Sequence, residues 1–266
     1  MKILGILNIT EDSFSDGGKF LATEAALTQA AALLDEGADI LDIGAASSNP
    51  DAKPVALQVE IARLQSVLPA LKARGASISI DTFSPEVQRW ALTQHPDYLN
   101  DIHGFPEPKL YPELAASKAR LIVMHMVQTE GVAVRTDVAS SEIFSRVREF
   151  FDRRLEALTK AGIAKDRLIL DPGMGQFVGA DPENSLILLR RLPELKARYD
   201  LPLLVSVSRK GFLRRLVNQP PDQSGPASLA AELFAQANGA DYIRTHAPAP
   251  LRDGLNVLKA IGRNKA

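Results

Sequence analysis

The sequence predicts a (β/α)8 TIM barrel, formed by a single domain that covers residues 1–266. Three observations predict this fold. Eight short apolar segments recur along the chain, each ends in polar residues, and a segment with helical periodicity follows each of them. The length of 266 residues suits one barrel of this kind.

The first four predicted strands cover residues 3–7, 40–43, 78–80 and 98–99. A helix is expected over residues 23–36, where Thr23 supplies an N-cap and Gly37 ends the apolar periodicity. A longer helix is expected near residues 55–74, and Pro85 lies where a first helical turn tolerates proline.

The last four predicted strands cover residues 121–124, 168–170, 203–205 and 242–243. Residues 168–170 form an apolar run that ends at Asp171 and a glycine-rich turn, which is typical of a parallel strand buried on both faces. A helix over residues 141–161 precedes this strand, and a closing helix is expected after Pro250. The loops after the first, second and fifth strands are long, as functional loops often are.

A doubly wound parallel sheet is the main alternative fold. It usually has fewer strands, and the first loop lacks the G-x-G-x-x-G pattern that a dinucleotide site needs there. The net charge of -1 gives no electrostatic reason to expect nucleic acid or an anionic membrane as partner. No segment approaches the roughly 20 apolar residues of a membrane span. The chain has no cysteine, which excludes disulfides and thiolate sites and suits a cytoplasmic location.

Polar residues collect at the ends of the predicted strands, which meet at one mouth of a barrel. Two carboxylates, Asp81 and Asp171, can accept hydrogen bonds from the N–H groups of a planar heterocycle. Cationic residues follow the seventh and eighth strands, where barrels commonly bind phosphate. Asn8 offers an oxygen that can ligate Mg²⁺ together with a substrate phosphate. The full set is Asn8, Ser48, Asp81, Asn100, His125, Asp171, Lys210, Arg244 and His246.

Seven motifs together closely resemble the dihydropteroate synthase family. In chain order they are GILNITEDSFSDGG at 5–18, SIDT at 79–82, LNDI at 99–102, MHM at 124–126, DPGMG at 171–175, SRK at 208–210 and RTH at 244–246. The match spans nearly the whole chain. A long run of ordered motifs is specific, whereas Asp-Pro-Gly alone would identify nothing.

The resemblance implies condensation of 6-hydroxymethyl-7,8-dihydropterin diphosphate with para-aminobenzoate, which releases diphosphate and gives 7,8-dihydropteroate. The catalytic residues would be Asp16, Asp81, Asp171 and Lys210, and the pterin ring would contact Asp81, Asn100, Asp171, Lys210 and Arg244. The diphosphate would contact Asn8 with Mg²⁺, Arg244, Thr245 and His246. The para-aminobenzoate pocket would include Phe14, Ser48, Pro50, Phe177 and Gly211. By analogy with the family, the protein is expected to be a homodimer.

Three segments depart from the usual pattern of that family. The second loop reads Ser-Ser-Asn-Pro at 47–50 where the family has Ser-Thr-Arg-Pro. Gly211 replaces a serine, which removes a side-chain contact to the para-aminobenzoate carboxylate and leaves backbone N–H groups at the start of the following helix as its alternative partners. The segment after Asp171 is about two residues longer than the common connection and lacks its lysine. These changes resemble the sulfonamide-insensitive, mobile resistance branch, although that branch also keeps the serine at 211. An enlarged segment beside Phe177 is expected to clash with the tail of a sulfonamide drug.

Two other functions remain open at the level of the sequence. One is a methyltetrahydrofolate-dependent methyltransferase barrel, which would need a corrinoid partner and no diphosphate site. The other is a pterin-binding module without catalytic activity. The cationic residues Lys210 and Arg244, with His246, favour the synthase over both.

Overall fold

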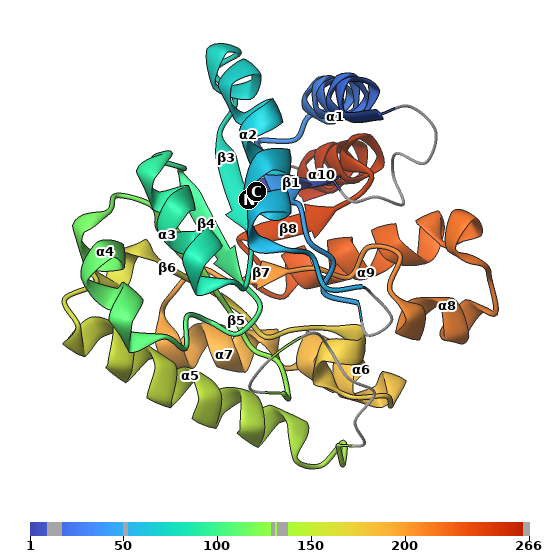
Figure 1. The fold of residues 1–266 in the computed structure, drawn as a ribbon. Helices are drawn as coiled ribbons and strands as arrows, with labels where there is room; N and C mark the ends of the chain where they lie inside the picture. The colour runs from blue at the N-terminus through green and yellow to red at the C-terminus, as the bar shows by residue number, and fades with distance from the viewer. Residues whose placement is uncertain (10–17, 50–52, 129–130, 132–137, 263–266) are drawn as a thin grey trace.

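The sheet of the protein is a ring of eight parallel strands (Figure 1). The computed structural model describes residues 1–9, 18–49, 53–128, 131 and 138–262. Within these residues the strand order is β6-β5-β4-β3-β2-β1-β8-β7, and a parallel bridge between Leu170 and Leu203 joins the two outer strands. The predicted (β/α)8 barrel is therefore confirmed, and the doubly wound sheet is excluded.

The strands are short, as barrel strands usually are. Their bounds are β1 (Lys2–Asn8), β2 (Ile40–Gly44), β3 (Ile78–Asp81), β4 (Tyr98–Asp101), β5 (Arg120–Met124), β6 (Leu168–Asp171), β7 (Leu204–Val205) and β8 (Tyr242–Thr245). The eight predicted strands all occur, with ends that shift by no more than two residues.

Helices cover the outside of the barrel, and they alternate with the strands (Figure 1). Their bounds are α1 (Gly18–Asp35), α2 (Leu57–Ala73), α3 (Pro85–Thr93), α4 (Tyr111–Ala116), α5 (Ile143–Lys160), α6 (Pro182–Arg190), α7 (Leu192–Tyr199), α8 (Gly211–Val217), α9 (Gly225–Ala237) and α10 (Pro248–Gly262). Ser84 caps α3 by accepting a hydrogen bond from the Val87 N–H, and Pro85 lies in its first turn as predicted.

Two connections hold a pair of helices where the sequence predicted one helical segment. The segment between β6 and β7 forms α6 and α7, which divide at Arg191, just before a proline in the first turn of α7. The segment between β7 and β8 forms α8 and α9. Asn218 ends α8 in a left-handed conformation with φ of 51°, and the prolines that follow cannot continue the helix. The closing helix begins at Pro248, two residues before Pro250.

The barrel interior contains an apolar layer near the N-terminal ends of the strands. Because side chains alternate along a strand, every second residue points inward. The inward layer is continuous around most of the ring and consists of Leu4, Ile40, Tyr98, Ile122, Ile169, Leu204 and Tyr242, all at most 5% exposed. A larger cluster fills the space between the strands and the helices. No helix in the described part of the chain has the length and apolarity that crossing a membrane requires.

Candidate active site

A polar layer lies directly above the apolar layer. It is formed by the residue two positions further along each strand, which again points inward. Its members are Ile6, Asp42, Asp81, Asn100, Met124, Asp171, Ser206 and Arg244. All except Asp42 line a cavity of about 1070 Å³ that opens at the C-terminal ends of the strands. The inward-facing side chains therefore form two successive layers: an apolar layer that closes the bottom of the barrel, and a polar layer that lines the cavity.

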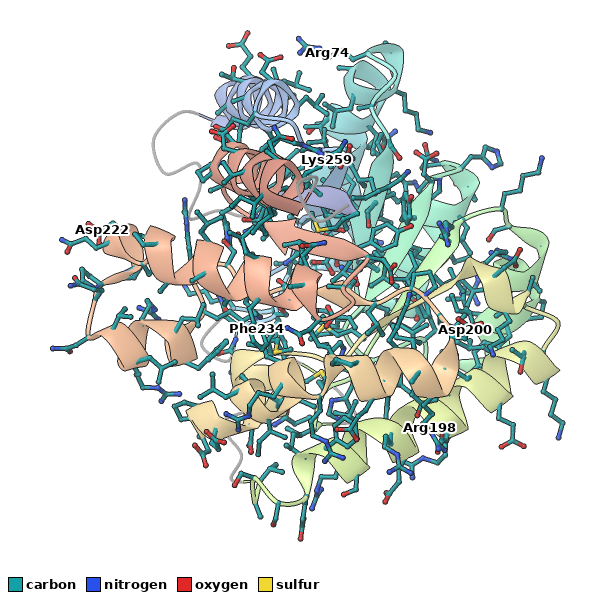
Figure 2. All side chains as sticks on the ribbon, turned by 180° about the vertical axis from the view of Figure 1, so that it is seen from behind. Arg74, Arg198, Asp200, Asp222, Phe234 and Lys259 are labelled. Atoms are coloured by element: carbon teal, nitrogen blue, oxygen red, sulfur yellow. The ribbon has the colours of Figure 1, made fainter. Side chains whose placement is uncertain are left out.

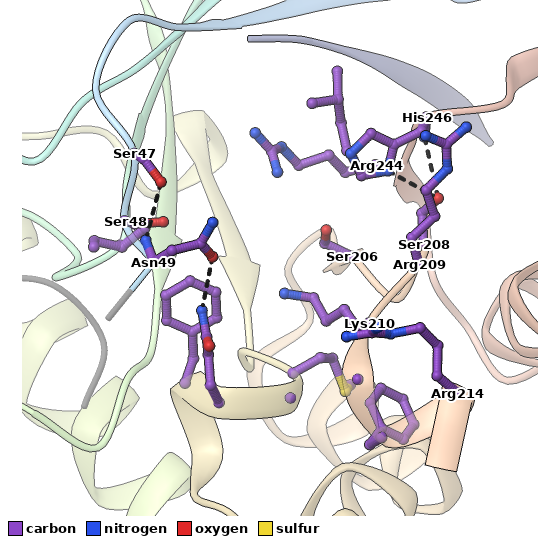
Figure 3. Close-up of a pocket in the computed structure, with 18 of the residues that line it drawn as sticks. Ser47, Ser48, Asn49, Ser206, Ser208, Arg209, Lys210, Arg214, Arg244 and His246 are labelled. Atoms are coloured by element: carbon purple, nitrogen blue, oxygen red, sulfur yellow. Dashed lines mark hydrogen bonds between the residues drawn. The ribbon is translucent and has the colours of Figure 1, made fainter. Parts of the chain in front are cut away.

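Loops complete the cavity above this layer (Figure 3). Ser47, Ser48 and Asn49 follow β2 on one side, while Lys210 and Arg214 extend from the other side. Ten of the predicted site residues line the cavity: Asn8, Ser48, Asp81, Asn100, Asp171, Phe177, Lys210, Gly211, Arg244 and His246. Three others, Phe14, Asp16 and Pro50, lie outside the described residues.

Arg244 lies between two carboxylates at the centre of the polar layer. Its Nε donates to Asp42 Oδ2 at 2.5 Å, and its Nη2 donates to Asp81 Oδ2 at 2.8 Å. Asn100 Nδ2 also donates to Asp42 Oδ2, at 3.4 Å. Burial, together with the nearby Asp42 charge, raises the pKa of Asp81 against the opposing effect of Arg244. Asp42 was not among the predicted site residues, although a carboxylate inside an apolar strand is a signal in the sequence.

Asp171 is oriented by the glycine-rich turn that follows it. Its Oδ1 accepts a hydrogen bond of 2.8 Å from the Gly173 N–H. Gly173 has φ of +75°, and a Cβ at this position would lie 2.3 Å from the carbonyl oxygen of His125, so no other residue fits. Burial raises the pKa of Asp171 to about 6, while the Gly173 N–H and Lys210 lower it. At neutral pH the carboxylate is mainly ionised and accepts hydrogen bonds only.

Lys210 reaches the same space from the start of α8. Its Nζ lies 4.6 Å from the centre of the Phe177 ring, which is a cation–π contact. A Cβ on Gly175 would lie 3.2 Å from Lys210 Cδ, so the glycine gives the lysine stem room. Burial lowers the pKa of Lys210 to about 8, and Asp171 opposes this shift. The lysine therefore remains mostly cationic at neutral pH.

Cations surround His246 at another part of the mouth. His246 Nδ1 lies 3.1 Å from Ser208 Oγ, and its backbone N–H donates to the same oxygen at 3.2 Å. Burial first, and then the charges of Arg244, Arg209 and Lys210, lower the pKa of His246 to about 3. The imidazole is therefore neutral, and it lies in a field that favours an anion. Arg209 lines this region and was not among the predicted site residues.

Two strand-end residues do not line the cavity. Thr245 is fully buried and follows Arg244 by one position, so it faces the opposite side of the strand. Its Oγ1 lies 3.4 Å from Ser208 Oγ and accepts from the Ala247 N–H at 3.2 Å. His125 was predicted to project over the mouth, which is wrong: it is 3% exposed, and its Nδ1 lies 3.1 Å from the Pro172 carbonyl oxygen. Both residues are therefore buried behind the residues that line the cavity.

A hydrogen bond across the mouth joins the second loop to the segment after β6. Gln176 Nε2 donates to Asn49 Oδ1 at 3.0 Å (Figure 3). Phe177 follows Gln176 in the short helix η4 (Gly175–Val178), is 7% exposed, and packs with Ile102, Met124 and Met126. Two of the segments that are expected to depart from the family pattern are therefore in contact with each other.

The candidate metal ligand Asn8 is exposed at the end of β1 and lines the cavity. No group of three or more histidine, aspartate or glutamate side chains in the described ranges is arranged to hold a metal ion. The site therefore offers isolated oxygen ligands rather than a protein cage. This donor set fits Mg²⁺, which typically keeps its waters and binds through one or two protein oxygens plus phosphates of a substrate.

The chain matches the family described as pterin binding enzyme over residues 4–246. It is 56% identical to dihydropteroate synthase type-2 of Escherichia coli over 259 residues, which are 97% of this chain and 95% of that protein. Among solved structures, Xanthomonas albilineans dihydropteroate synthase with 4-aminobenzoic acid has a TM-score of 0.89 and 35% identity, and the match covers 98% of this chain and 93% of that one. The Yersinia pestis dihydropteroate synthase in a sulfonamide drug complex has a TM-score of 0.88 and 33% identity, with coverage of 99% and 94%.

Proposed function

This chain belongs to the pterin binding enzymes and within them to the dihydropteroate synthases, and from this premise we propose how its residues divide the reaction. The enzyme is a transferase of folate biosynthesis. It joins the methylene carbon of 6-hydroxymethyl-7,8-dihydropterin diphosphate to the amine of para-aminobenzoate and releases diphosphate. The observation that supports the division of roles best is the polar layer in which two carboxylates and an amide face one cavity.

The pterin ring binds in the deep part of the cavity. Asp171 and Asp81 accept hydrogen bonds from its N–H groups, and Asn100 contributes both a donor and an acceptor. The Asn100 Oδ1 is buried without a hydrogen-bond partner among the described residues, so a ligand donor can satisfy it. Arg244 contacts this region as well, but its main partners are Asp42 and Asp81, so it chiefly fixes the carboxylate positions.

The diphosphate binds near Lys210, Arg209 and His246. A neutral imidazole still donates one N–H to a phosphate oxygen, and the charge of the bound anion favours its protonation. Thr245 contributes through Ser208, whose hydroxyl contacts both Thr245 and His246. Asn8 would hold Mg²⁺ against the phosphates, where the metal would offset their negative charge.

The bond between the methylene carbon and the diphosphate oxygen breaks first, and the diphosphate leaves with the electron pair. The electron-rich pterin stabilises the resulting cation, and the lone pair of the para-aminobenzoate amine then attacks it. The attached nitrogen afterwards loses one proton to water. Lys210 and the neighbouring cations stabilise the departing charge. An aniline nitrogen needs no strong base to attack a cation, which agrees with the absence of a Ser-His-Asp arrangement among the described residues that line the cavity.

Para-aminobenzoate occupies the outer part of the cavity, between Ser48 on one side and Phe177 and Gly211 on the other. Asp16 remains proposed as a catalytic residue, and Phe14 and Pro50 remain proposed as part of the para-aminobenzoate pocket; all three lie outside the described residues. The protein is also proposed to be sulfonamide-insensitive. In this proposal Phe177, which lines the cavity, obstructs the bulky tail of a para-aminobenzoate analogue, and the Gln176–Asn49 hydrogen bond supports that wall.

The protein is proposed to form a homodimer in the cytoplasm. Exposed apolar side chains gather on two adjacent helices: Phe234 on α9 is 44% exposed, and Val257 and Ile261 on α10 are 58% and 62% exposed. Phe234 lies on the outer face of α9 in the rear view (Figure 2). An apolar surface of this kind favours burial against a second copy. The chain's lack of cysteine suits the reducing conditions of the cytoplasm.

The test is the steady-state rate of diphosphate release with both substrates and Mg²⁺, repeated without para-aminobenzoate. A synthase releases diphosphate together with an equal amount of 7,8-dihydropteroate, and the product depends on para-aminobenzoate. A pterin-binding module would bind the pterin substrate without releasing diphosphate. That outcome would disprove the proposed catalytic roles and leave binding as the function.

A further inference from the structure

Arg214 is a cavity-lining cation that lacks a partner in the described structure. It follows Gly211 by one helical turn on α8, and its side chain extends toward Lys210 (Figure 3). Its Nε is buried without a hydrogen-bond partner among the described residues. The next residue, Arg215, instead donates from Nη2 to the Ala180 carbonyl oxygen at 2.8 Å. The two adjacent arginines therefore differ, since Arg215 anchors a loop and Arg214 remains available to a ligand.

Gly211 leaves open the space beside this guanidinium. A Cβ built on Gly211 would lie 3.5 Å from Arg214 Nη2, and no other described atom beyond the adjacent residues and the backbone of α8 lies within 4 Å of it. A longer side chain at this position would project toward the Arg214 Nη2 atom. Because glycine has no side chain, a planar ligand group can approach Arg214 directly at this point.

The chemistry of the second substrate determines which of its ends faces Arg214. The amine of para-aminobenzoate must face the methylene carbon of the pterin, and the carboxylate lies at the opposite end of the ring. The deep part of the cavity holds Asp81 and Asp171, which repel a carboxylate. The carboxylate is therefore directed outward, toward the side of the cavity formed by α8.

We propose that Arg214 binds the carboxylate of para-aminobenzoate, with the space beside Gly211 admitting that group, and so makes the enzyme specific for an anionic amine substrate. A guanidinium presents parallel N–H donors in a plane that matches a carboxylate, so the contact is strong and directional. This proposal rests on the proposed function, because the ligand is the second substrate of that reaction.

The experiment compares two substrates of similar shape, para-aminobenzoate and the neutral para-aminobenzamide, in which an NH2 group replaces one carboxylate oxygen. In the Arg214→Met variant, kcat/KM for para-aminobenzoate is expected to fall by about 10- to 100-fold, mainly through KM, since a hydrogen bond to a charged group is lost. The value for para-aminobenzamide should change by less than about threefold, because the amide never formed the charged contact. The Arg214→Gln variant should give the same pattern, and it replaces the first variant if that one does not fold.

The control is Arg74→Met, which removes the same charge from the exposed C-terminal end of α2, at the opposite end of the barrel from the mouth. This variant should leave both substrates unaffected. Equal losses for both substrates in Arg214→Met would mean that Arg214 acts on the fold, and unchanged values would mean that it does not contact the carboxylate. Either result overturns the proposal while turnover by the unaltered protein still supports a synthase. Absence of turnover in the unaltered protein would overturn both.

Discussion

At the scale of single residues, the site depends on side-chain alternation along the strands. Asp81, Asp171 and Arg244 could be selected from the sequence because each carries charge and directly follows a predicted apolar strand. The sequence alone could not reveal that Arg244 pairs with Asp42, since the two positions are 202 residues apart and meet only when the barrel closes. The alternation of side chains along a strand does predict that Thr245 and Arg244, as neighbours in β8, face opposite sides of the strand.

Replacing Asp171 by asparagine should weaken pterin binding without unfolding the barrel. The amide has one accepting oxygen instead of two and no charge, so we expect the affinity for 6-hydroxymethylpterin to fall by about 10- to 100-fold. Titration calorimetry measures the affinity, and circular dichroism checks the fold. Asp181→Asn is the matched control, because Asp181 is an exposed cap of α6 outside the cavity lining. Equal affinity in the two variants would remove Asp171 from the pterin site.

The activity should show a bell-shaped dependence on pH. The pKa of Asp171 is raised to about 6, so below that pH its carboxyl is protonated and cannot accept two hydrogen bonds. The pKa of Lys210 is lowered to about 8, so above that pH its positive charge is lost. We expect kcat/KM for the pterin substrate to fall on both sides of the interval between about 6 and 8. A flat profile from pH 5 to pH 9, in roughly unit steps, would contradict both assignments.

At the scale of elements, strands provide the chemical groups and loops provide the shape of the outer pocket. The strands were predicted well because each is a compact apolar run that is followed by polar residues. The division of the helices after β6 and β7 was missed, since a proline at position 193 is also compatible with the first turn of a single later helix. The contact between Asn49 and Gln176 was also missed, because it joins two loops that are distant in the chain.

Shortening the Phe177 side chain should make the enzyme more sensitive to sulfonamides. In Phe177→Ala, the wall beside the outer pocket recedes, and a bulky tail gains room. We expect the concentration of sulfamethoxazole that halves activity to fall by at least about tenfold, measured at matched para-aminobenzoate saturation. Met126→Ala serves as the control, because Met126 packs with Phe177 but does not line the cavity. If both variants shift equally, the cause is looser packing and the proposed role of Phe177 is wrong.

At the scale of the whole molecule, the distribution of exposed apolar side chains on the outer surface bears on how the protein associates. Most exposed large apolar side chains of the described residues lie on the last three helices, α8 to α10, and none of them belongs to the motifs that identify the family. Their exposure could not be read from the sequence, because an apolar residue on a helix is as compatible with a buried face as with an exposed one.

Placing a charge on this surface should separate the proposed dimer. In Phe234→Glu, a carboxylate would have to be buried at the interface, so we expect the monomer mass by light scattering where the unaltered protein has the dimer mass. Val59→Glu is the control, since Val59 is a similarly exposed apolar residue, at 42%, on α2. A dimer that persists in Phe234→Glu would place the interface elsewhere.

The alternation of the strands also determines where the chain can change its length. Inserting or deleting one residue within β6 would turn Asp171 outward and move Leu170 into the mouth, so both the apolar layer and the polar layer would lose a member. An insertion or deletion in a connection between two strands moves neither the apolar layer nor the polar layer. The segment after Asp171, which is expected to be longer than in the rest of the family, lies in such a connection. A lineage of this enzyme can therefore remodel the rim of its pocket by insertion while the pterin chemistry is inherited unchanged.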